Sequence, residues 1–201
     1  MKKYTIRRVE GVPYWSALPY IEIDNERSEN PHGITARAQI CYNDEELLVH
    51  LTTAEKNYIA NETGVLGAPC RDSCLEFFFC PNDGDGRYFN IEFNSNGCLY
   101  LGIGSGVKDL IRLIPDNSKA NILEPSITKG YDGWEIFYRV PYEFIRRFFP
   151  DFKVWSGKKM RANCYKCADT SVPAHYIAWS WLEGEPLSFH NTKCFGTMTF
   201  E

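Results

Sequence analysis

The sequence predicts an all-β protein, an antiparallel β-sandwich of jelly-roll-like form with one short helix. Strand-like segments recur along the chain at the short spacing that is typical of sandwiches. Three consecutive segments within residues 71–103 alternate between apolar and polar side chains, as strands with one buried face do. Only residues 141–149 carry a convincing helical pattern.

The chain is expected to form a single domain over residues 1–201. It contains no low-complexity stretch or linker that would mark a boundary. Hydrophobic residues make up 44% of it, and they include 13 Phe, 12 Tyr and 5 Trp, which is enough for a sizeable core. This composition argues against disorder.

The expected strands follow one another through short turns. In chain order they cover residues 34–42, 46–55, 72–80, 87–94, 99–103, 133–140, 160–167, 175–181 and 195–201. The sequence NDEE supplies the first reversal, and PNDGDG supplies Gly and Asp for the reversal between the third and fourth strands.

The third, fourth and fifth strands divide their side chains into an apolar and a polar face. The apolar positions are Leu75, Phe77, Phe79, Phe89, Ile91, Phe93, Leu99, Leu101 and Ile103. Carboxylates and amides occupy much of the opposite face, including Glu76, Asn90 and Glu92. A sheet of this kind can bury one face and use the other for binding.

The single expected helix covers residues 141–149. Pro141 suits a first helical turn, and Pro150 ends the helix. Phe144, Ile145 and Phe148 share one side. We expect this side to close one end of the sandwich.

The strand over residues 160–167 repeats the polar pattern with Arg161, Asn163 and Tyr165 on one face. If it joins the same sheet, one concave surface receives Asp72, Glu76, Asn90, Glu92, Arg161, Asn163 and Tyr165. An ordinary solvated outer face remains the alternative interpretation.

Charge and hydropathy exclude several classes of partner. The net charge of -4 and the absence of a long basic run argue against nucleic acid. The amino terminus lacks the apolar stretch of a secretory signal, and no segment is long enough to span a bilayer. The chain as given is therefore expected to be cytoplasmic and not membrane-bound, or extracellular if a signal was removed.

The eight cysteines are expected to be reduced thiols, because a chain of this size needs no disulfide framework. Cys164 and Cys167 have CxxC spacing, and with Cys70 and Cys74 they raise the hypothesis of a four-thiolate zinc site. A strand, however, places Cys164 and Cys167 on opposite faces. No metal or cofactor is therefore predicted.

Several segments resemble the carbohydrate-binding family 9-like domains, over residues from about 34 to the end. They are RDSCLEFFF, GRYFNIEFNSNGCLYLG, MRANCYKCAD, HYIAWSW and FGTMTFE. The resemblance implies a β-sandwich that binds glycans without cleaving them, in xylan or other carbohydrate catabolism, with glycoside hydrolases as partners. It also leaves room for a structural calcium, for which the sequence identifies no ligands.

The resemblance also implies a site in which two aromatic rings clamp a sugar and polar residues bind its hydroxyl groups. Trp179 or Trp181 could form one ring wall, one of them being core and the other surface, whereas no Trp precedes the RDS motif. Arg71 either joins the site or pairs with Asp72. The candidate ligand-binding residues are Arg71, Asp72, Glu76, Asn90, Glu92, Arg161, Asn163, Tyr165, Trp179 and Trp181.

Two alternatives stay open on the sequence alone. Glu76 and Glu92 on adjacent strands could act as the carboxyl pair of a glycoside hydrolase. A protein-interaction sandwich without a sugar site is the other alternative, in which the polar face is only solvated surface.

Overall fold

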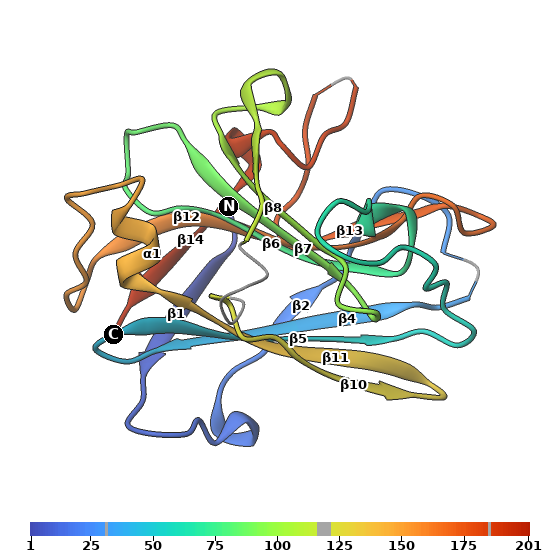
Figure 1. Cartoon of the computed structure of the whole chain (residues 1–201), viewed down its shortest axis with the longest axis horizontal. Helices are drawn as coiled ribbons and strands as arrows, with labels where there is room; N and C mark the ends of the chain where they lie inside the picture. The colour runs from blue at the N-terminus through green and yellow to red at the C-terminus, as the bar shows by residue number, and fades with distance from the viewer. Residues whose placement is uncertain (31, 116–121, 185) are drawn as a thin grey trace.

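The computed structural model describes residues 1–30, 32–115, 122–184 and 186–201, and these form one curled sheet with one short α-helix (Figure 1). Within these residues, no helix is long and apolar enough to cross a membrane. The strands are β1 (Lys3–Arg8), β2 (Ile21–Ile23), β3 (Asn25–Glu26), β4 (Thr35–Tyr42), β5 (Glu46–Ala54), β6 (Cys74–Cys80), β7 (Tyr88–Asn94), β8 (Leu99–Gly104), β9 (Ile111–Leu113), β10 (Ser126–Gly130), β11 (Gly133–Pro141), β12 (Lys159–Ala168), β13 (His175–Ala178) and β14 (Gly196–Phe200). The α-helix is α1 (Tyr142–Arg146), and short 3-10 turns cover Trp15–Ala17, Pro69–Arg71, Val107–Asp109 and Thr192–Cys194.

The sheet is mixed, which corrects the expectation of a wholly antiparallel arrangement. Its main path runs β10-β11-β5-β4-β1-β14-β12-β6-β7-β8-β9. Residues 3–6 of β1 pair in parallel with β14, and residues 7–8 pair in parallel with β4. The other pairings among the described strands are antiparallel. The amino-terminal strand thus joins two antiparallel halves.

We name these parts the β12 half, with β3, β6–β9 and β12–β14, and the β5 half, with β2, β4, β5, β10 and β11. Figure 1 shows the two halves facing each other, and their apolar side chains form one continuous core. All nine apolar positions expected in residues 75–103 lie in that core. The alternation in the sequence therefore identified the buried face correctly.

The outer face of the β12 half is also covered, which the sequence pattern did not predict. Residues 182–184 and 186–195, here called the covering segment, lie against it. A second apolar cluster contains Phe78 and Tyr165 from the sheet and Leu182 and Phe195 from the covering segment. The Tyr165 hydroxyl donates to the Phe189 carbonyl at 2.8 Å. The polar face is consequently mostly buried.

The helix is shorter than expected but packs as predicted. It covers Tyr142–Arg146, and the N–H groups of Phe148 and Phe149 extend the turn by donating to the Ile145 carbonyl. Phe144 and Ile145 are buried in the core, and the Phe144 ring lies 5.2 Å from that of Phe89. The helix therefore closes one end of the core, near the carboxyl terminus of the chain (Figure 1).

A buried polar network joins the two halves where β12 and β13 lie near the end of β5. Lys166 Nζ on β12 lies 3.1 Å from the carboxylate of Glu55, which follows β5, and 2.7 Å from His175 Nε2 on β13. Ser73 donates to Glu55, and Trp134 Nε1 on β11 donates to the Ser73 hydroxyl at 2.9 Å. Because each charge in this network has a partner, the network can be buried without leaving an unpaired ion.

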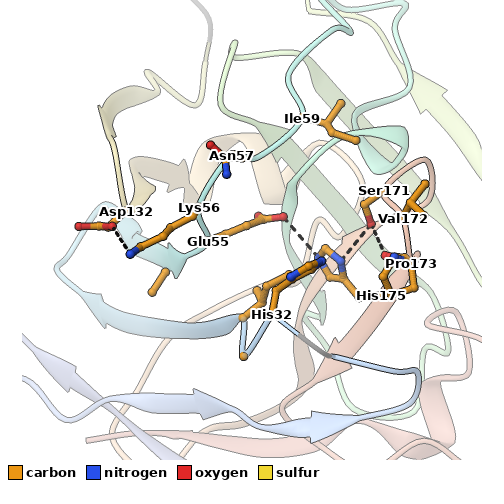
Figure 2. A pocket seen from close by; sticks show the side chains of 13 residues that line it. His32, Glu55, Lys56, Asn57, Ile59, Asp132, Ser171, Val172, Pro173 and His175 are labelled. Carbon is orange, nitrogen blue, oxygen red and sulfur yellow. Dashed lines mark hydrogen bonds and ion pairs between the residues drawn. The ribbon is translucent and has the colours of Figure 1, made fainter.

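His175 is held in its neutral form by this environment. Burial, and then the positive charge of Lys166, lower the pKa of His175 to about 4, although the Glu55 carboxylate acts in the opposite sense and His32 adds to the lowering. The Ser171 hydroxyl lies 3.1 Å from His175 Nδ1 (Figure 2). The folded state therefore excludes a proton that an unfolded histidine accepts below pH 6.5.

We expect the protein to lose stability as pH falls from 6.5 to 4, because unfolding takes up a proton at His175 in that window. In His175→Gln, whose amide can accept from Lys166 and donate to Ser171, this loss should shrink by about 2 kcal/mol. Urea unfolding at pH 7 and pH 4.5 measures the difference. The exposed His32→Gln variant removes only the lesser contribution of His32 to the lowered pKa of His175, so it should reduce the loss far less than His175→Gln does. Equal pH slopes in the wild type and His175→Gln would contradict the assignment.

Gly133 opens β11 at a position that accepts only glycine. Its φ is +150°, and an added Cβ would lie 1.9 Å from the Thr53 carbonyl oxygen on the paired strand β5. We expect Gly133→Ala to lower the free energy of unfolding by at least about 2 kcal/mol. Gly106→Ala, where no atom lies within 4 Å of the added Cβ, should leave stability nearly unchanged. Denaturant titration of both variants tests this difference.

Candidate functional site

A cavity of about 420 Å³ lies between the outer face of the β12 half and the covering segment. Its sheet side carries Glu76 from β6, Glu92 from β7 and Cys167 from β12. The covering segment contributes Phe189 and His190 to the lining. We call this cavity the carboxyl pocket.

Glu76 and Glu92 meet because they are register partners on neighbouring antiparallel strands. Burial, followed by the adjacent Glu92 carboxylate, raises the pKa of Glu76 well above its usual range. Burial also raises the pKa of Glu92 to about 7. A protonated carboxyl group can donate a hydrogen bond and an ionised one accepts, so near neutral pH the pair offers both functions.

Aromatic side chains from β13 and the covering segment also line the pocket. The ring of Phe189 stacks on Tyr165 with centroids 4.1 Å apart and planes 10° apart. Tyr176 from β13 also lines the pocket and lies edge-on to Phe189, with ring centroids 6.1 Å apart. Sequence reasoning missed Phe189 because the covering segment has no strand or helix periodicity.

Trp179 and Trp181 separate into one core and one surface residue, as expected. Trp179 is buried in the core. Trp181 is 53% exposed, and the guanidinium carbon of Arg27 lies 4.2 Å from its ring centroid. Because Arg27 lines the carboxyl pocket, Trp181 supports the pocket wall through this contact. The two Trp do not share a strand face, since β13 ends at Ala178.

β13 ends at Ala178, before the expected end at residue 181, and beyond it the Asn163 side chain bonds to the Ser180 backbone. The side-chain oxygen of Asn163 accepts from the Ser180 N–H at 2.8 Å, and its amide nitrogen donates to the Ser180 carbonyl at 3.2 Å. Arg161 is likewise occupied, because it donates to backbone carbonyls of Thr192, Lys193 and Phe195. Both side chains hold the covering segment and its approach in place, so the structure does not present them to the pocket.

Asp72 is also engaged inside the protein. Its carboxylate accepts from the N–H groups of Asn61 and Glu62 and from the Asn94 side chain, at 2.7–2.8 Å. The side chain is 1% exposed and fixes the loop between β5 and β6. The expectation that the polar residues share one concave binding surface was therefore wrong for Asp72, Arg161 and Asn163. Their side chains hydrogen-bond to backbone groups within the protein.

The remaining predicted residues lie around the pocket without lining it. Arg71 is exposed and pairs with Glu62 at 3.5 Å rather than with Asp72. Asn90 is fully buried opposite Phe78 in the β6–β7 ladder. Tyr165 is fully buried beneath Phe189. Of the ten predicted ligand-binding residues, Glu76 and Glu92 therefore line the carboxyl pocket.

A larger cavity of about 670 Å³ opens beside the buried network of Glu55 and His175 (Figure 2). Its polar side chains mostly satisfy one another. Lys56 pairs with Asp132 at 3.4 Å, and Ser171 donates to backbone carbonyls while contacting His175. The carboxyl pocket is the better candidate, since its two acids face an open cavity next to aromatic rings.

The chain matches a family model described as carbohydrate-binding family 9 over residues 15–200. A candidate carbohydrate-binding protein from Bacteroides uniformis has a TM-score of 0.81 and 25% identity, with 100% of this chain and 99% of that chain covered. A family 9 module from Caldicellulosiruptor kristjanssonii, solved with glucose and with cellotriose, has a TM-score of 0.69 and 12% identity. Those alignments cover 100% of this chain and 96% and 94% of the module.

A comparison with curated protein sequences finds no match. The family model extends over nearly the whole chain and includes every strand that builds the carboxyl pocket. The chain belongs to carbohydrate-binding family 9.

Proposed function

We propose that the protein binds a carbohydrate noncovalently in the carboxyl pocket. The observation that carries the proposal is the buried Glu76–Glu92 pair facing a cavity that Phe189 and Tyr176 also line. A pyranose has an apolar face of C–H groups and a rim of hydroxyl groups. It therefore needs an aromatic surface together with donors and acceptors in fixed positions.

The ligand class we propose is a glucose-containing saccharide or a related oligosaccharide. The structurally similar Caldicellulosiruptor module was solved with glucose and with cellotriose, which supports a hexose of this kind. Each hydroxyl contact replaces a bond to water and contributes only about 1 kcal/mol. We therefore expect dissociation constants of roughly micromolar to millimolar.

The finer expectations from the sequence remain part of this proposal. The two halves of the curled sheet would act as the layers of a β-sandwich, with the carboxyl pocket on the outer side of one layer. A role in carbohydrate catabolism, including xylan breakdown, and cooperation with glycoside hydrolases would follow from sugar binding. Family membership is what supports these steps.

Phe189→Ala should weaken sugar binding about tenfold, because it removes the ring on which the sugar face would lie. Isothermal titration calorimetry with gluco-, cello- and xylo-oligosaccharides measures the change. Trp155→Ala is the control, since it also removes an aromatic ring but Trp155 is exposed and lies outside the carboxyl pocket. Circular dichroism verifies that both variants fold.

Two outcomes would contradict the proposal. Equal affinity in Phe189→Ala and the wild type would remove the pocket from sugar binding. Absence of binding to every saccharide in the panel at millimolar concentration would favour a protein-interaction role instead.

Glycoside hydrolysis is the second candidate, and the raised pKa values of two carboxyl groups on neighbouring strands favour it. Hydrolysis also needs the two carboxyl groups to flank the scissile bond, whereas Glu76 and Glu92 are register partners side by side on the sheet wall of the pocket. We therefore expect no release of nitrophenol from aryl glycosides. Turnover that the wild type shows and Glu76→Gln lacks would establish an enzyme instead.

A further inference from the structure

Two cysteines and a glutamate form a buried cluster, of which Glu76 and Cys167 line the carboxyl pocket. Cys74 and Cys167 are opposite each other in the β6–β12 ladder, and Glu76 lies on the same face two residues along β6. Their ligand atoms, two Sγ and one carboxylate oxygen, all lie within 4.8 Å of one another. The Cys167 Sγ is 3.0 Å from Glu76 Oε1. Sugar binding makes no use of these thiols.

We propose that Cys74, Glu76 and Cys167 bind a zinc-like divalent cation. Thiolate and carboxylate oxygen are both ordinary zinc ligands, and zinc–sulfur bonds of about 2.3 Å in a tetrahedron place two ligand atoms about 3.8 Å apart. The cluster is already close to that spacing, so small side-chain rotations suffice to form the site. Its three ligands come from strands, whose backbone positions the ladder fixes.

Access and coordination number both favour an open site. The three side chains are at most 2% exposed, yet Glu76 and Cys167 line the carboxyl pocket, which provides a path for the cation. Three protein ligands leave one tetrahedral position for water or for an oxygen ligand from the pocket. Glu92, on the neighbouring strand, would remain free to bind a hydroxyl group.

The spacing of cysteines in the sequence pointed to a different ligand set. Cys164, the partner of Cys167 in the CxxC motif, is buried in the apolar core on the opposite face of β12. Cys74, a member of that predicted set, lies opposite Cys167 because β6 pairs directly with β12, and Glu76 is the third ligand. All eight cysteines are free thiols, so Cys74 and Cys167 are available as ligands.

Titration of the reduced full chain with Co²⁺ tests the site directly. We expect one equivalent to bind with tetrahedral d–d bands and a thiolate-to-cobalt charge-transfer band, and Zn²⁺ to displace it. Removing a residue that only hydrogen-bonds to a metal ligand weakens metal affinity about 10- to 100-fold. Removing a ligand itself should cost more, so Cys167→Ala and Cys74→Ala should each weaken cobalt binding by more than about 100-fold. Glu76→Gln should weaken binding while retaining the charge-transfer band.

Cys164→Ala is the matched control, because it removes a buried thiol from the same strand on the opposite face. It should retain the cobalt spectrum. Absence of a charge-transfer band in the wild type, its persistence in Cys167→Ala, or its equal loss in Cys164→Ala would overturn the proposal. The readout uses no saccharide, so its result is separate from that of the sugar titrations.

Discussion

The structure of the site depends on the burial of the outer face of β6, β7 and β12 beneath the covering segment. This segment has no regular hydrogen-bonded ladder of its own, so side chains of the sheet must satisfy its backbone groups. Arg161 donates to the carbonyls of Thr192, Lys193 and Phe195 in this segment, and Tyr165 donates to that of Phe189. The polar residues used in this way become part of the scaffold and set the boundary of the carboxyl pocket.

The carboxyl groups of Glu76 and Glu92 are buried in the pocket with raised pKa values. A buried carboxyl costs free energy unless it is protonated or paired, and the raised pKa of Glu92 records this cost. Asp72, by contrast, is buried with three donors around its carboxylate. Glu76, by comparison, has the Cys167 thiol 3.0 Å from its carboxylate. Buried acids with raised pKa values are concentrated at functional sites, and this sets Glu76 and Glu92 apart from Asp72.

The core-facing side of the β12 half contains a buried ion pair. There Lys166 reaches across to Glu55, and the ion pair connects strands of the two halves through the core boundary. Residues 166 and 167 thus point to opposite faces of β12, one into a network that joins the halves and the other into the pocket. One strand thereby serves both stability and the candidate site.

The sequence by itself determined which side chains share a strand face. The alternation from Leu75 to Ile103 predicted the apolar core, and it placed Glu76 and Glu92 on one polar face, because side-chain direction in a strand has a period of two. It also separated Cys164 from Cys167. The family motifs extended this local pattern to an all-β fold class, but they did not define which polar groups remain accessible.

Only the tertiary structure decided which polar residues are accessible. The parallel pairing of β1, the early end of β13 and the course of the covering segment depend on contacts between residues far apart in the chain. Such contacts leave no periodic signal in the sequence. For that reason Phe189 and Arg27 entered the pocket unpredicted, Asp72 and Asn163 became structural, and Glu76 joined Cys74 and Cys167 in one cluster.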